Sequence, residues 1–218
     1  MPHNIVNGFC ESGCKVPVKP AAQVEDLQHG GTGVSVKTIS ELAKALGLMP
    51  VYTGPSDIYV DPNATAEQVA TGGYFRTFQA ALDVLSYKAI LSFVTVHLAA
   101  GMAETGTWMM RGSFILGETV TITGDASNPA ILTGTLSIRR ISGKVILTNF
   151  EVNFSDDNTG VDILGKNTDA CLQKVVVRGS GNGNCIRTDE AVYLNIENCE
   201  MYNAAYAAFI QNGTTAIL

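Results

Sequence analysis

The sequence predicts an all-β protein built as a parallel β-helix, and two observations support this fold class. The first is a repeat of about 24 residues, which aligns "LTNFEVNF" from Leu147, "LQKVVVRG" from Leu172 and "IENCEMYN" from Ile196. The second is an independent column with the same period, formed by Val161, Cys185 and Phe209. Two registers of one period indicate coils of short strands and polar corners, each stacked on the next.

The aligned stretches also predict which side chains stack inside the coils. Phe150, Val175 and Cys199 correspond, with spacings of 25 and 24, and the residues two positions later do the same: Val152, Val177 and Met201. Upstream, "ETVTITGD" and "AILTGTLSIRR" alternate like strands and end in Gly-marked turns, so we assign 104–218 to the coils. The period predicts another inward strand past residue 218, and we expect a longer fibre to continue there.

Composition agrees with a turn-rich β protein and excludes several other classes. Hydrophobic residues are 46% of the 218, charged residues 16%, and there are 22 Gly. The net charge is −6 without a clustered basic stretch, which argues against nucleic-acid binding. The longest apolar run, 89–100, is too short to span a bilayer, so we expect no membrane insertion. Five Cys and a start without signal-peptide character predict synthesis in a reducing compartment.

Residues 1–36 are predicted to form an extended arm that docks on a partner. Met1 to His29 shows no sustained period and holds three Pro, and "QHGGTG" follows at its end. Residues 37–49 are predicted to form one short helix, with Thr38 as N-cap and Glu41 completing a capping box. The predicted docking and interface residues are Asn4, Ile5, Val6, Phe9, Cys10, Cys14, Val16, Val18, Ile39, Leu42 and Leu46.

The last three of these residues form a narrow apolar face on the short helix. A helix of this length is marginal in water by itself, so something must bury that face. Three-fold self-association is one closed symmetry that does so, and we therefore expect a homotrimer.

Residues 50–103 are predicted to start the β-helix with a strand and a capping helix. Phe78, Ala81, Leu82 and Leu85 lie on one helical face, and the stretch from Phe93 to Leu98 follows as a strand. An open end of a parallel β-helix exposes core and unpaired backbone groups, so a terminal element must cover it. We expect this amphipathic helix to be that cover.

Two motifs resemble known proteins. "HGGTGVSVKTISELAKALGL" resembles a stretch common in bacteriophage tail fibre proteins, and it covers about a tenth of the chain. "IYVDPNATAEQVATGGYFRTFQAALDVL" resembles the entry segment of pectin-lyase-like β-helix proteins, including many tailspikes, in which a strand, a helix and a strand ending in Ala-Gly follow one another. This resemblance implies a right-handed parallel β-helix in the N-terminal part of a tail fibre or tailspike.

Few residues suggest chemistry. Cys10 and Cys14 lack a second ligand pair, so we predict no metal site and no cofactor. A glycoside hydrolase needs two carboxylates, but we interpret the candidates as residues of solvated turns and predict no catalytic residue here. These candidates are Asp156, Asp157, Asp162, Asp189 and Glu190.

Other candidates also have structural interpretations. We interpret His97 as a structural histidine without an identifiable partner carboxylate, and Thr65 as the cap of a short helical turn. Three cysteines are expected to pack as small hydrophobes: Cys171, Cys185 and Cys199. Aromatic residues are only 7%, which argues against a glycan platform in these coils.

The leading hypothesis is a structural tail fibre or tailspike component of a phage virion, assembled in the host cytoplasm. Its arm attaches to tail or baseplate proteins, and its β-helix projects toward a bacterial surface polysaccharide or another host receptor. The alternative is a polysaccharide depolymerase, a glycoside hydrolase or lyase, with its active site farther along the fibre or between subunits. A bacterial pectin-lyase-like enzyme is a third hypothesis, which the fibre-like front of the chain disfavours.

Overall fold

The computed structural model divides the chain into two compact units, Met1–Val51 and Tyr52–Leu218. The structure describes residues 5–6, 9–10, 27–29, 32–34, 49–155, 158–165, 167–190, 192–211 and 214–217. The predicted coils therefore lie almost entirely within the described part, whereas most of the predicted arm does not.

In the first unit the described backbone forms two short antiparallel strand pairs. β1 (Ile5–Val6) pairs with β2 (Phe9–Cys10), and β3 (Leu27–His29) pairs with β4 (Thr32–Val34). Four of the predicted docking residues thus lie in β1 and β2. The predicted helix of residues 37–49 lies outside the described residues, except at its last position, and so do the other docking and interface residues: Asn4, Cys14, Val16, Val18, Ile39, Leu42 and Leu46.

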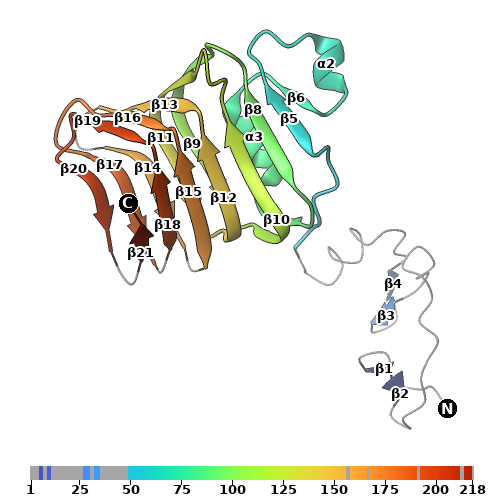
Figure 1. Ribbon diagram of the computed structural model, residues 1–218. Coiled ribbons are helices and arrows are strands. Elements are labelled where there is room, and N and C mark those ends of the chain that lie inside the picture. The colour runs from blue at the N-terminus through green and yellow to red at the C-terminus, as the bar shows by residue number, and fades with distance from the viewer. Residues whose placement is uncertain are drawn as a thin grey trace. The chain divides into compact units, whose positions relative to one another are not determined.

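The second unit confirms the predicted all-β fold class. It is a parallel β-solenoid of about 5 turns, and 55% of the structure is strand. Its strands stack side by side from β5 to β21, and every described strand pair in it is parallel (Figure 1). Because each coil passes through both sheets, neighbouring strands within a sheet come from successive coils.

The first sheet has the order β21-β18-β15-β12-β10-β8-β5-β6, with β7 also paired to β10. Its strands are β5 (Asp57–Val60), β6 (Tyr74–Phe75), β7 (Ala89–Ile90), β8 (Val94–Leu98), β10 (Phe114–Thr123), β12 (Ser142–Thr148), β15 (Thr168–Gln173), β18 (Tyr193–Glu197) and β21 (Thr215–Ile217).

The second sheet contains two long strands and three pairs of short ones. Both β13 and β14 pair with β11, along its first and second halves respectively, so one long strand is replaced by two in later coils. The strands are β9 (Ala103–Arg111), β11 (Ala130–Arg139), β13 (Phe150–Asn153), β14 (Thr159–Leu164), β16 (Val176–Arg178), β17 (Asn184–Asp189), β19 (Glu200–Tyr202) and β20 (Tyr206–Ile210).

Glycine permits a close approach where the two long strands stack. Gly134 is in register with Gly106, and a Cβ on Gly134 would lie 1.7 Å from the Gly106 carbonyl oxygen. Gly134 also has a φ of 143°, which L side chains rarely adopt. A side chain at this position is therefore incompatible with the stacking of β11 on β9.

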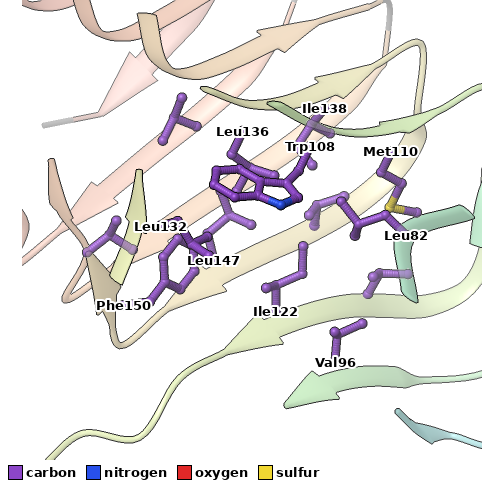
Figure 2. Close-up of a cluster of buried hydrophobic side chains, with 14 of the residues drawn as sticks. Leu82, Val96, Trp108, Met110, Ile122, Leu132, Leu136, Ile138, Leu147 and Phe150 are labelled. Carbon is purple, nitrogen blue, oxygen red and sulfur yellow. The ribbon is translucent and has the colours of Figure 1, made fainter. Parts of the chain in front are cut away.

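The inward side chains stack in columns that carry most of the stability. In the first sheet, one column runs through successive coils as Val96, Ile122, Leu147, Leu172 and Ile196. The first four of these residues are at most 1% exposed, and each buried side chain of this size contributes roughly 1.5–3 kcal/mol. Figure 2 shows part of this core, with Trp108 lying among Leu136, Ile138 and Leu147.

The predicted column of Val152, Val177 and Met201 is confirmed, but the second predicted column is wrong. Val161 pairs with Ile186 rather than Cys185, and Phe209 pairs with Arg187. The reason is that successive coils differ in length. Five residues separate β16 from β17, whereas only three separate β19 from β20, so the register shifts although the mean period stays near 24.

A helix packs against the first long strand. Helix α3 (Phe78–Leu85) buries the four residues predicted for its apolar face, and Thr77 caps it by accepting a hydrogen bond from the Ala80 N–H. Its Gln79 side chain bonds to both backbone groups of Met109 in β9: Oε1 accepts from the N–H at 2.7 Å and Nε2 donates to the carbonyl at 3.1 Å. The amide of Gln79 thus satisfies β9 as a neighbouring strand would.

The interpretation of Thr65 as a helix cap is also confirmed. Thr65 begins α2 (Ala66–Ala70), and its side chain accepts a hydrogen bond from the Gln68 N–H at 3.2 Å. Gln68 Oε1 in turn accepts from the Thr65 N–H at 2.8 Å, which completes a capping box.

Candidate functional site

One corner of the solenoid places charged residues in a left-handed backbone conformation. The residue that follows each of β9, β11, β14 and β17 has a positive φ: Gly112 (69°), Arg140 (54°), Gly165 (143°) and Glu190 (67°). Backbone hydrogen bonds between successive coils continue through this corner, from the Gly112 N–H to the Arg139 carbonyl and from the Gly165 N–H to the Asp189 carbonyl. Glycine adopts this conformation freely, whereas other residues lose about 1–2 kcal/mol.

Two hollows adjoin at this corner, and we call them together the corner groove. The first has a volume of about 310 Å³ and is lined by Tyr87, Met109, Arg111, Gly112, Arg139, Arg140, Leu164 and Glu190. The second, of about 340 Å³, is lined by Phe114, Arg140, Ser142, Asn167 and Glu190. Arg140 and Glu190, the two non-glycine residues of the left-handed corner, line both hollows.

A buried carboxylate fixes the arginines at one side of the corner groove. Asp162 in β14 is 1% exposed and lies between β11 and β17. Its two oxygens accept from Arg139 Nη2 and from Arg187 Nε, each at 2.8 Å. The hydrogen bond to Asp162 raises the pKa of Arg187. Because both oxygens are engaged by guanidinium groups, Asp162 is suited to positioning side chains rather than to transferring a proton.

A second arginine is held by an aromatic ring. Arg111 stacks over Tyr87, with its guanidinium carbon 5.3 Å from the ring centroid, and the Tyr87 N–H donates to the Arg111 carbonyl at 2.8 Å. A Cβ on Gly112 would lie 2.5 Å from the Tyr87 ring, so glycine at this corner leaves space for the aromatic side chain. Tyr87 is 52% exposed.

The structure changes the interpretation of the predicted carboxylates. Asp162 was expected in a solvated turn, but it is a buried strand residue because the neighbouring coils supply two arginines. Glu190 does lie in a corner and is exposed, and it lines the corner groove. Asp189 ends β17, one residue earlier. Asp156 and Asp157 lie outside the described residues.

His97 has a partner carboxylate, contrary to the expectation. Its Nε2 lies 2.9 Å from Asp57 Oδ1, because β5 and β8 are neighbours although 40 residues separate the two side chains. The hydrogen bond from His97 lowers the pKa of Asp57. The His97 ring also stacks on Tyr59, which stacks on Tyr74, so this cluster fits the predicted structural role.

The three cysteines pack as predicted. Cys171 is 6% exposed, Cys185 is fully buried, and Cys199 is partly buried against the core. Burial raises the pKa of each thiol. A raised pKa disfavours the reactive thiolate, so these positions suit packing rather than nucleophilic chemistry.

Sequence reasoning missed Tyr87 and the three arginines of the corner groove. A signal was present in the sequence: the strand ends "RG" at Arg111, "RR" at Arg139, "LG" at Leu164 and "DE" at Asp189 recur at spacings of 28, 25 and 25. The alternation of Gly with charged residues at this period marks the left-handed corner.

Comparison with models of known families finds no match, and neither does comparison with curated proteins or with solved structures. The class that the fold defines is therefore a parallel β-solenoid protein. Within the described residues, no helix has the length and apolarity needed to cross a membrane, and no cluster of three or more potential metal ligands occurs. Arguments about function consequently rest on the geometry of the coils and of the corner groove.

Proposed function

We propose that the chain is a structural component of a bacteriophage tail fibre or tailspike. Its N-terminal unit attaches to tail or baseplate proteins, three copies associate, and the β-solenoid projects toward the host surface. The observation that carries this proposal is the joining of a parallel β-solenoid of about 5 turns to a separate N-terminal unit. The "HGGTG" motif and the entry segment, which resemble those of tail fibres and tailspikes, support the same function.

The solenoid suits a projecting role because its interior is filled. The inward columns are apolar along the stack, and each coil contacts its neighbours through a continuous ladder of backbone hydrogen bonds. In this proposal α3 ends the stack: its four apolar residues join the core, and Gln79 occupies the edge of β9 that would otherwise be open. Recognition of a host receptor then falls to the outer surface.

The described charges favour binding over hydrolysis. A glycosidase needs one carboxylic acid able to donate a proton and a second carboxylate nearby. Asp162 is committed to two arginines, and Glu190 faces a groove lined by three more guanidinium groups or their neighbours. The outer surface therefore presents fixed charges for recognition.

The first test is the mass of the full chain in solution. Three chains of 23.1 kDa give about 69 kDa, so sedimentation equilibrium or light scattering should report about 69 kDa at micromolar concentration. The triple variant with Ser at Ile39, Leu42 and Leu46 should be a folded monomer with an unchanged far-UV circular dichroism spectrum. A wild-type monomer would contradict the trimeric fibre.

The second test separates recognition from depolymerisation. The purified chain is incubated with bacterial capsule or lipopolysaccharide, and released oligosaccharide is measured by mass spectrometry. The proposal predicts retention of the chain on bacterial cells without released oligosaccharide. Release of oligosaccharide would favour a depolymerase instead.

A further inference from the structure

The corner groove gathers positive charge on a chain whose net charge is −6. Three arginines line its first hollow against a single carboxylate, that of Glu190. Two of them, Arg111 and Arg139, are directly in register on neighbouring strands. Like charges placed opposite each other on adjacent strands are destabilising unless something neutralises them.

The carboxylates of the described residues do not fully neutralise these arginines. The described ion pairs involve Arg139, Arg178 and Arg187, but neither Arg111 nor Arg140. Arg139 shares Asp162 with Arg187, and its buried Nε has no hydrogen-bond partner within the described part of the chain. Donors therefore remain available on all sides of the first hollow.

The backbone at Arg140 gives an independent indication. At the equivalent corner position, the coils on either side have Gly112 and Gly165, which tolerate the left-handed conformation. Arg140 adopts it with a φ of 54°. Non-glycine residues are held in such conformations mostly where function needs the side chain, and here the backbone aims a guanidinium into both hollows.

We propose that the corner groove binds the oxyanion of a negatively charged ligand, with Arg111, Arg139 and Arg140 as donors. Carboxylate, sulfate and phosphate groups share the acceptor geometry that guanidinium groups recognise. Glu190 lines both hollows and supplies an acceptor for a hydroxyl or ammonium group next to the oxyanion. This inference rests on the proposed function, because it assigns the receptor site to one corner of the outer surface.

The test uses four monosaccharide probes: glucuronate, glucose 6-sulfate, glucose 6-phosphate and neutral glucose. Binding is measured on the ¹⁵N-labelled full chain from amide and arginine Nε chemical shifts. At least one charged probe should bind with a Kd on the order of 1 mM, at least tenfold tighter than glucose, and shift the resonances of the groove arginines. The charged probe that binds most tightly identifies the kind of oxyanion.

Arg140→Gly is the decisive variant, because glycine occupies the same corner in the neighbouring coils. It should retain the fold and lower the affinity for the charged probe at least tenfold. Lys174→Gly is the matched control, since Lys174 also has a left-handed φ of 53° and a positive charge but lies outside the corner groove. Its affinity should equal that of the wild type.

Three results would overturn the proposal: equal affinity for glucose and the charged probes, no binding of any charged probe at 20 mM, or unchanged affinity in Arg140→Gly. The outcome is separable from that of the proposed function. Absent oxyanion binding in a trimeric protein would remove only the groove assignment. Oxyanion binding by a stable monomer would support the groove and contradict the fibre.

Discussion

Asp162 links three neighbouring coils, and replacing it by asparagine tests whether the charges between coils stabilise the solenoid. The side chain belongs to β14, and its two arginine partners belong to β11 and β17, the strands on either side. Asparagine has nearly the same shape but a single acceptor oxygen. The Asp162→Asn change therefore keeps one hydrogen bond and turns an amide donor toward the other guanidinium.

The magnitude follows from the burial of the three side chains. A hydrogen bond to a charged group contributes about 1.5–3 kcal/mol when buried. The side chain of Asp162 is 2% exposed, but those of Arg139 and Arg187 are 40% and 37% exposed, so water replaces part of what the arginines lose. We expect the free energy of unfolding to fall by about 2 kcal/mol, below the full cost of breaking a buried ion pair.

Urea unfolding at pH 7, followed by far-UV circular dichroism, measures this loss. Glu151→Gln is the control: it breaks the pair with Arg178, whose side chains are 19% and 44% exposed, and should cost less than about 1 kcal/mol. In an Arg187→Gln background, Asp162→Asn should cost less than in the wild type, because one bond is already lost. A loss of under about 0.5 kcal/mol in the wild-type background would refute the reasoning.

Three further predictions concern the backbone and one exposed pair. Gly134→Ala should lose more than about 4 kcal/mol, because the new Cβ would lie 1.7 Å from the Gly106 carbonyl oxygen; soluble yield and circular dichroism check this, and a folded variant with wild-type Tm would contradict it. Arg140→Gly should gain about 1 kcal/mol by relieving the left-handed conformation, measured as a Tm rise of about 2–4 °C; an unchanged or lower Tm would argue against strain. His97 lowers the folded-state pKa of Asp57, so this pair should stabilise the fold above about pH 4 and lose that effect as pH falls through the lowered pKa; unfolding from pH 2 to 6 should show this dependence in the wild type but not in Asp57→Asn.

The sequence predicted the coils because their physics is local and repetitive. A stacked coil must place an apolar side chain inward at each return of the chain, so Val152, Val177 and Met201 recur near the mean period. The helix with Phe78 and the capping box of Thr65 were likewise predictable, since both depend on residues within one helical turn of each other.

Contacts between coils depended on the tertiary structure. A mean period of 24 does not fix the register, because corners of three and five residues shift it; this is why Val161 faces Ile186 and not Cys185. The same register places the guanidinium groups of Arg139 and Arg187 on the carboxylate of Asp162.

The sequence alone therefore determined that the chain winds into stacked coils with apolar interiors, since burial of alternating side chains is a property of each strand. The tertiary structure decided which outward side chains meet. Those contacts join residues about 25 positions apart, and only the exact length of each corner sets them. The corner groove, its arginines and the buried Asp162 all belong to this second group.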